Sequence, residues 1–235
     1  MQQFEAHHNP VGKAGKGLGL VGQWGSCRWS DMTMQRTIKK ILDQILGWLT
    51  FLALSPLLWL LAGLIRLDSP GPAFFLQVRI GRGGKPFVAI KFRSMVDKAS
   101  TMGLGLNVAA DDNRITRMGH FLRSTSMDEL PQLFHVLNGD MSLVGPRPTL
   151  PYQVAAYNDF QRRRLAVKPG ITGWAQVNGR NSIPWEERIK LDVWYVDHWS
   201  LSLDFSILLK TIKVWARQEG LYGPTGVNYD FVAAS

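Results

Sequence analysis

An uncharged run of 21 residues, 45–65, most constrains how this chain can fold. At about 1.5 Å per residue, a straight helix over the run would be about 31 Å long, close to the hydrocarbon thickness of a bilayer. A helix that spans the membrane is therefore the simplest interpretation. Two features of the run and its flanks instead favour a helix that enters the membrane and returns to the same face.

The first feature is Ser55-Pro56, at the middle of the run. Pro56 removes one helix hydrogen bond and clashes with the preceding turn, and the Ser55 hydroxyl can bond to a backbone group that is freed nearby. The second feature is a set of basic residues at both ends, which the positive-inside tendency places in the cytoplasm, although the whole chain is basic. They are Arg36, Lys39 and Lys40 before the run, and Arg66, Arg79 and Arg82 after it. We therefore expect a re-entrant, helix-break-helix membrane segment over residues 34–68.

Residues 123–148 carry the most informative chemistry. Asp128 and Glu129 are adjacent at the start of a predicted short helix, which has apolar residues at helical spacing and stops at Gly139. A carboxylate at a helix N-terminus lies among unpaired N–H groups, which favour its ionised form and also attract phosphate. An ionised Asp beside phosphate can act as a nucleophile toward phosphorus or as a magnesium ligand.

The same acids also fit an ordinary helix cap. Ser126 and Glu129 match the capping box S-x-x-E, although a helix capped by Ser126 would need the N–H that Pro131 lacks. A cap at Asp128 would instead place Pro131 harmlessly in the first turn. These residues alone leave both the capping and the catalytic interpretation open.

Charge and composition narrow the class of partner. A net charge of +9 favours an anionic partner: nucleic acid, acidic lipid or a phosphorylated substrate. Nine Trp favour a membrane–water interface, and the long apolar run is hard to reconcile with nucleic-acid binding. The single cysteine, Cys27, excludes an intramolecular disulfide framework and a multi-cysteine zinc site, and it fits a reducing, cytoplasmic location.

The rest of the chain predicts an α+β, mostly helical fold. Residues 1–33 are glycine-rich without apolar periodicity, so we expect a disordered leader or a cloning remnant there. Aromatic and β-branched residues predict a small β-hairpin, with strands over 73–80 and 86–92, in a catalytic domain over 69–235. Lys91 and Arg93 would share one face at the strand end, on a solvated edge or lining a phosphate site.

After the acidic pair we expect a helix over residues 151–164 and two amphipathic helices, over 186–195 and 204–217. The first ends in Arg162-Arg163-Arg164, a run that is usually a solvated face and that could here also contact anionic lipid headgroups. Four of the five Trp in the last third fit either core packing or helices lying on a membrane surface: Trp185, Trp194, Trp199 and Trp215.

Four motifs in order resemble the bacterial sugar transferases, the small monotopic phosphoglycosyl transferases that begin lipid-linked glycan synthesis. They are KFRSM at 91–95, DELPQL at 128–133, GDMSLVGPRP at 139–148 and KPGITGWAQVNGR at 168–180. The resemblance covers roughly residues 35–215 and implies the re-entrant helix with a Ser-Pro break. It also implies a bacterial inner (cytoplasmic) membrane location with the catalytic domain facing the cytoplasm.

The resemblance implies a reaction as well. Members of the family transfer a phospho-sugar from a UDP-sugar to undecaprenyl phosphate and release UMP, the first membrane step in making exopolysaccharide, O-antigen, capsule or glycoprotein glycans. Asp128 matches the nucleophile that would form a covalent phospho-sugar intermediate, and Glu129 matches the second member of the dyad. Membrane lipids and downstream glycosyltransferases would be further partners, and nucleic acid would not.

The phosphate groups in such a site need compensating cations. Mg²⁺ held by Asp128 and Glu129 is the expected cofactor. The expected substrate- or phosphate-binding residues are Lys91, Arg93, Arg123, Pro146, Arg147 and Arg180. Two alternatives remain, a membrane-anchored magnesium-dependent phosphohydrolase that uses the same acids and a non-enzymatic module that binds the membrane surface through its basic face.

Overall fold

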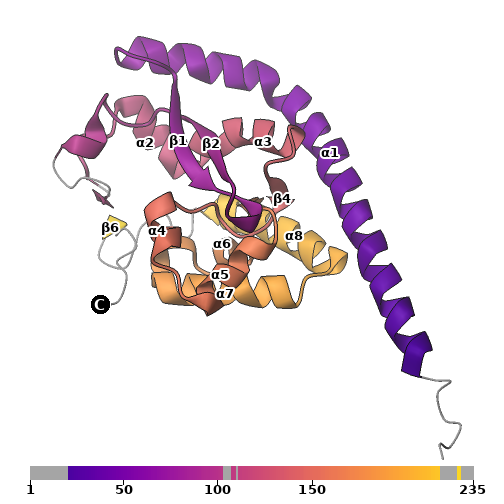
Figure 1. The fold of residues 1–235 in the computed structure, drawn as a ribbon. Coiled ribbons are helices and arrows are strands. Elements are labelled where there is room, and N and C mark those ends of the chain that lie inside the picture. The colour runs from indigo at the N-terminus through magenta and orange to yellow at the C-terminus, as the bar shows by residue number, and fades with distance from the viewer. Residues whose placement is uncertain (1–20, 103–106, 110, 218–226, 229–235) are drawn as a thin grey trace, which may run out of the picture. The chain divides into compact units, whose positions relative to one another are not determined.

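The computed structural model describes residues 21–102, 107–109, 111–217, 227 and 228 (Figure 1). The chain consists of two compact units, Met1–Thr37 and Ile38–Ser235. Helix α1 (Val21–Asp68) begins inside the segment that we expected to be a leader. This stretch holds no Pro, so a helix can propagate through it toward the N-terminus. Residues 1–20, including most of a G-x-G-x-x-G match at 17–22, lie outside the described residues.

The second unit contains many short elements, which confirms the mostly helical α+β prediction. Its helices after α1 are α2 (Arg117–Ser124), α3 (Leu133–Leu137), α4 (Pro151–Ala155), α5 (Asp159–Arg162), α6 (Trp174–Val177), α7 (Trp185–Asp197) and α8 (Leu201–Arg217). Short 3-10 helices are η1 (Arg82–Gly84), η2 (Ala99–Thr101), η3 (Met127–Gln132), η4 (Arg163–Ala166) and η5 (Arg180–Ser182). The strands are β1 (Phe74–Ile80), β2 (Pro86–Phe92), β3 (Val108–Ala109), β4 (Ser142–Val144), β5 (Gly170–Thr172) and β6 (Val227–Asn228).

The strands form small two-stranded sheets. β1 pairs antiparallel with β2, from Phe74 opposite Phe92 to Ile80 opposite Pro86, which confirms the predicted hairpin. β4 pairs with β5 in parallel, and β3 pairs with β6 antiparallel. The β4–β5 pair matters for the site, because the segment that follows β4 contains Arg147.

One predicted helix, over residues 151–164, is wrong: the structure has two short helices there, α4 and α5. The cause is a local cap at Asn158, whose side chain accepts from the Gln161 N–H at 2.9 Å while the Gln161 side chain accepts from the Asn158 N–H at 3.0 Å. This reciprocal capping box starts a new helix and turns the chain away from α4. The arginines that follow are consequently not on one solvated helix face, since Arg164 is buried.

Among the described residues, one helix segment, Thr33–Asp68, is long and apolar enough to cross a membrane. Only 17% of its most apolar window is buried by the rest of the protein, so it is not an ordinary core helix. α1 continues through Pro56 as a curved helix rather than as two separate helices (Figure 1). The Ser55 hydroxyl explains this continuity, because it donates at 2.9 Å to Leu52 O, the carbonyl that Pro56 leaves without its N–H partner.

The second half of α1 packs on the domain through its apolar side chains. Leu61 and Ile65 are buried in a cluster with Phe92 of β2 and Leu122 of α2. After the apolar run, the Asp68 carboxylate accepts from the Met118 N–H at 3.0 Å, at the start of α2. This end of α1 is therefore fixed to the domain by both apolar and polar contacts.

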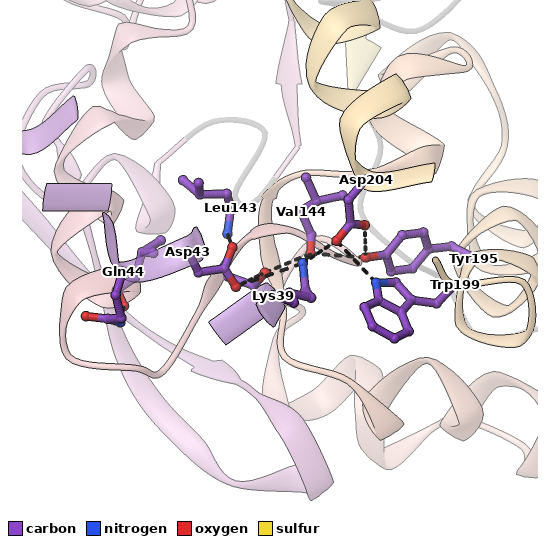
Figure 2. A network of polar contacts seen from close by, with 10 residues as sticks. Lys39, Asp43, Gln44, Leu143, Val144, Tyr195, Trp199 and Asp204 are labelled. Carbon is purple, nitrogen blue, oxygen red and sulfur yellow. Dashed lines mark hydrogen bonds and ion pairs between the residues drawn. The ribbon is translucent and has the colours of Figure 1, made fainter. Parts of the chain in front are cut away.

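The first half of α1 is fixed by polar contacts just before the apolar run (Figure 2). Asp43 accepts from the Ser142 hydroxyl at 2.7 Å and from the Leu143 N–H at 3.1 Å. One residue on, Gln44 Nε2 donates to Val136 O at 2.7 Å. Both ends of the apolar run thus bind the same domain.

Lys39 completes this attachment through Asp204 of α8 (Figure 2). Its ammonium lies 2.6 Å from Asp204 Oδ2 and donates to Val144 O at 3.2 Å. The Tyr195 hydroxyl donates to Asp204 Oδ1 at 2.7 Å, and Trp199 Nε1 donates to Oδ2 at 3.2 Å. Each oxygen of the Asp204 carboxylate is therefore hydrogen-bonded, which is what a buried charge requires.

Asp204→Ala is expected to destabilise the domain strongly, because the Lys39 ammonium and the Tyr195 hydroxyl lose their shorter, charged hydrogen bonds and are left to share Val144 O at 3.2 Å. The free energy of unfolding should fall by about 3 kcal/mol, the lower end for a broken buried pair, since the Lys39 side chain is 19% exposed. Thermal unfolding of purified protein in detergent measures this. The matched control is Asp197→Ala, which breaks a half-exposed pair with Arg163 and should cost less than about 1 kcal/mol. Equal losses in the two variants would contradict the account.

Candidate active site

The acidic pair lies in η3, a six-residue 3-10 helix that leads directly into the short helix α3. Ser126 immediately before it has φ 57°, in the left-handed region, and its side chain makes no cap to the turn. The hydroxyl instead accepts from Arg180 Nη2 at 3.0 Å. The capping box that Ser126 and Glu129 could form is therefore absent, and the two acids are not explained as a helix cap.

Glu129 is held by two cations. Its Oε1 lies 2.8 Å from Lys91 Nζ on β2, and its Oε2 accepts from Arg147 Nη1 at 2.7 Å. Arg147 Nη2 also donates to Oε1, so the arginine binds the carboxylate in a bidentate fork. Burial alone would raise the pKa of Glu129, but Arg147 and Lys91 hold that pKa well below its usual range. Glu129 is therefore stabilised in its ionised form and binds two cations.

Asp128 has a different environment, although it is the next residue. Within the described part of the chain, its carboxylate has no hydrogen bond or ion pair. Burial and the adjacent Glu129 charge raise the pKa of Asp128, and Lys91, Arg123 and Arg147 only partly offset this rise. This differs from the expectation that a helix N-terminus keeps Asp128 ionised, because burial of the carboxyl group, the largest cause of the raised pKa, disfavours its charged form. Two adjacent acids with pKa values pushed apart are typical of divided catalytic roles.

Further cations surround the pair. Arg123 and Arg180 both act on the Asp128 charge, and Arg123 Nη1 reaches Ser94 Oγ at 3.4 Å. Burial, followed by the charge of Arg147, lowers the pKa of Arg180. Burial lowers the pKa of Lys91 too, and repulsion from Arg147 contributes. The charge of Arg147 thus lowers the pKa of both neighbouring cations, and a bound phosphate would offset this repulsion.

The structure thus brings together most of the predicted residues: Asp128, Glu129, Lys91, Arg123, Arg147 and Arg180. Pro146 adjoins Arg147, and its carbonyl accepts from the Gly170 N–H at 2.9 Å. Arg93 is not brought to this cluster, because its guanidinium donates to Ser69 O and Pro70 O, both at 2.6 Å. These carbonyls follow the end of α1, where a helix leaves acceptors unpaired that attract a cation.

Comparison with known proteins identifies the family. The family model described as bacterial sugar transferase matches residues 34–218, a range that contains every residue of this cluster. The chain belongs to the bacterial sugar transferase family. It is 46% identical over 184 residues to the uncharacterized sugar transferase EpsL of Bacillus subtilis, which is 78% of this chain and 90% of EpsL.

Two relatives have names that state an activity. The undecaprenyl-phosphate galactose phosphotransferase of Salmonella typhimurium is 42% identical over 202 residues, covering 80% of this chain and 42% of that protein. The UDP-glucose:undecaprenyl-phosphate glucose-1-phosphate transferase of Escherichia coli is 40% identical over 195 residues, covering 76% and 40%. The chain therefore spans less than half the length of these two family members.

The two acids of the site differ in their capacity to hold magnesium. Mg²⁺ is usually held by one or two carboxylates together with substrate phosphates and water. The described residues contain no group of three or more His, Cys, Asp or Glu placed to hold a metal ion. Asp128 fits as a ligand because its oxygens are not engaged within this part of the chain, whereas both oxygens of Glu129 are bonded by Lys91 and Arg147. A magnesium ion would thus take Asp128 and complete its shell from substrate and water.

Three residues near the site were not predicted to belong to it, and one of them, Arg164, was interpreted instead as part of a solvated face. Arg188 of α7 has its pKa lowered to about 10, by burial first and then by the charge of Arg147. Arg164 and Asp192 form a buried ion pair beside the Arg147 backbone. Neither motif nor spacing marks these positions, because Arg164 and Asp192 are 28 residues apart and on different elements.

Proposed function

We propose that this protein transfers a sugar phosphate from a UDP-sugar to undecaprenyl phosphate, with Asp128 as the covalent nucleophile. The observation that carries the proposal is the contrast within the acidic pair. Glu129 is bonded by two cations, while Asp128 next to it has a carboxylate without a partner among the described residues. Family membership and the names of the two relatives support the substrate classes.

In the first half-reaction, one Asp128 oxygen attacks the sugar-bearing β-phosphorus of the UDP-sugar. The bond from this phosphorus to the bridging oxygen breaks, UMP leaves with that oxygen, and an acyl phosphate that carries the sugar remains on Asp128. In the second half-reaction, a phosphate oxygen of the lipid attacks the same phosphorus and returns the Asp128 carboxylate. Bound magnesium would supply charge neutralisation on the phosphates.

The cations have separate tasks in this scheme. Arg147 and Lys91 are fixed by Glu129 before substrate arrives, so little reorganisation is needed when negative charge develops on the leaving phosphate. Arg123 acts on the Asp128 charge and Arg180 is near both acids, and these two arginines would bind further phosphate oxygens. A phosphate that binds there also relieves the repulsion among these cations.

The acceptor is a lipid, and two features support a site at the membrane surface. α1 carries exposed apolar side chains along the run, such as Leu52 and Trp59. α8 exposes Phe205, Leu209 and Ile212, at the spacing of one helix face, with Lys213 and other cations near its end. The protein would lie in one leaflet, with the phosphate of undecaprenyl phosphate at the depth of the cation cluster.

The contacts of α1 support the re-entrant topology. Lys39 and Asp43 before the apolar run, and Asp68 after it, all bind the same domain. A folded domain lies on one side of a bilayer, whereas the two ends of a spanning helix lie on opposite sides. We therefore propose that both ends face the cytoplasm.

A two-substrate assay tests the proposed function. Purified protein in detergent with magnesium is mixed with UDP-glucose or UDP-galactose and with undecaprenyl phosphate. Sustained UMP release and a lipid product that carries both phosphate and sugar are expected only when both substrates are present. Steady release of free sugar phosphate without lipid would instead indicate a phosphohydrolase.

Cysteine labelling tests the topology. Single cysteines at Lys40 and Leu67, two exposed positions on either side of the run, are introduced with Cys27→Ser. Both should be shielded from a membrane-impermeant thiol reagent in intact cells and labelled after permeabilisation. Reaction of one of them in intact cells would mean that α1 spans the membrane. Pro56→Leu returns the N–H that Leu52 O lacks, and it should raise the fraction of spanning protein.

A further inference from the structure

The turn that carries Arg147 is held at four successive carbonyl groups. Pro146 and Pro148 have no N–H, so this turn cannot fix itself through those amides and depends on donors from elsewhere. Each carbonyl has one: Pro146 O accepts from Gly170 N at 2.9 Å, Arg147 O from Arg164 Nη2 at 3.0 Å, Pro148 O from Arg79 Nη1 at 3.2 Å, and Thr149 O from Ile80 N at 2.9 Å. The Arg147 side chain is thereby presented from a fixed backbone.

The donor at the centre of the turn is a buried charge. Arg164 is 3% exposed, and its guanidinium also donates to the Tyr157 hydroxyl at 2.7 Å and pairs with Asp192, which is 2% exposed. A buried ion pair seldom stabilises a fold more than apolar residues of the same size would. Stability alone is therefore a weak reason for this pair, whereas its contact with the Arg147 carbonyl connects it to the site.

We propose that Arg164 is a positioning residue for Arg147: held by Asp192 and Tyr157, it fixes the Pro146–Pro148 turn so that the Arg147 guanidinium meets Glu129. The proposal rests on the proposed function in that Arg147 serves the reaction. Arg164 itself bonds the Arg147 backbone, and its hydrogen bonds reach neither Asp128 nor Glu129. Its effect on catalysis must pass through Arg147.

Arg164→Lys is the informative variant, because it keeps the charge but replaces a planar fork with a point charge that cannot bond Asp192, Tyr157 and the carbonyl together. We expect kcat/KM to fall by about tenfold, the effect of losing one charge-assisted hydrogen bond. The matched control is Arg163→Lys, the same change at the neighbouring residue, whose side chain is 49% exposed in a pair with Asp197. It should stay within about twofold of the wild type.

A double-mutant cycle separates positioning from general damage. In an Arg147→Ala background, Arg164→Lys should change kcat/KM by less than about twofold, because the group through which it acts is gone. Full additivity of the two losses would overturn the proposal. If Arg164→Lys fails to fold, Tyr157→Phe replaces it in the cycle, since it removes the hydroxyl that bonds Arg164 and keeps the ring. The same coupling, with a smaller loss, is then expected.

Hydrogen exchange supplies a readout that does not depend on activity. Amides in a peptide that covers residues 144–150 should exchange faster in Arg164→Lys, or in Tyr157→Phe, than in Arg163→Lys. Unchanged exchange there would overturn the proposal even if activity fell. If wild-type protein released no UMP from UDP-glucose or UDP-galactose with lipid present, the proposed function would fail, while this exchange comparison would still decide whether Arg164 fixes the turn.

Discussion

Asp128→Asn is expected to abolish turnover, with a loss of at least about a thousandfold, because an amide has nearly the same shape as the carboxylate but no charge with which to attack phosphorus. UMP release from UDP-sugar in the presence of undecaprenyl phosphate measures the effect. The substitution should leave the local structure unchanged, because Asp128 makes no hydrogen bond within the described residues that an amide would lose. Activity within tenfold of the wild type would remove Asp128 as nucleophile.

The stability of this variant separates a catalytic role from a structural one. The pKa of Asp128 is raised in the folded protein, which means that the fold disfavours the ionised carboxylate. The free energy of unfolding therefore falls as pH rises through that pKa. At neutral pH Asp128→Asn should therefore melt no lower than the wild type. Glu129→Gln should melt lower, because a depressed pKa means that the ionised Glu129 stabilises the fold above the ordinary carboxyl pKa. The opposite ranking of the two melting temperatures would contradict the assigned roles.

Arg147→Ala is expected to lower kcat/KM for the nucleotide sugar by about tenfold to a hundredfold, the range for one lost charge-assisted contact. The variant removes a cation from the phosphate site, and Glu129 then keeps only its ion pair with Lys91. Arg147→Lys should recover only part of the loss, because lysine cannot form the bidentate fork. Initial rates at varied UDP-sugar concentration measure both variants.

The pH dependence provides a second check on Arg147. Its charge lowers the pKa of Asp128, so Arg147→Ala should move the acid limb of the kcat/KM profile to higher pH. Arg163→Ala, which removes an arginine from a half-exposed pair with Asp197, should change neither the rate nor the profile. An unmoved acid limb together with unchanged kinetics would place Arg147 outside the site.

The elements that depend mainly on neighbouring residues were predicted from local sequence patterns. The hairpin of β1 and β2 follows from its aromatic and β-branched residues, and α7 and α8 follow from helical periodicity. The missed break between α4 and α5 also had a local signal, the cap formed by Asn158 and Gln161, which the apolar periodicity concealed. The sequence predicted that the Ser55 hydroxyl bonds a backbone group freed by Pro56, but not that this bond lets α1 continue through the proline.

The candidate site was predictable where its residues lie in recognisable motifs. Asp128, Glu129 and Arg147 meet as expected, but the sequence could not tell that Arg147 and Lys91 would bind Glu129 rather than Asp128. Strand alternation predicted that Arg93 would lie on the same face as Lys91. In the structure the Arg93 guanidinium instead donates to the carbonyls of Ser69 and Pro70, just after α1. The buried pair of Arg164 and Asp192 is a contact between distant elements, and such pairs leave no pattern in one sequence.

The most direct test of the central claim, that Asp128 forms a covalent intermediate, is intact-protein mass spectrometry after mixing enzyme, magnesium and UDP-sugar without lipid acceptor. Wild-type protein should gain the mass of one sugar phosphate, on a peptide that contains Asp128. UMP should appear in a burst near one equivalent per enzyme, and undecaprenyl phosphate should then remove the added mass. An unmodified protein that nevertheless transfers sugar phosphate once lipid is added would contradict the claim, since the lipid would then attack the UDP-sugar directly.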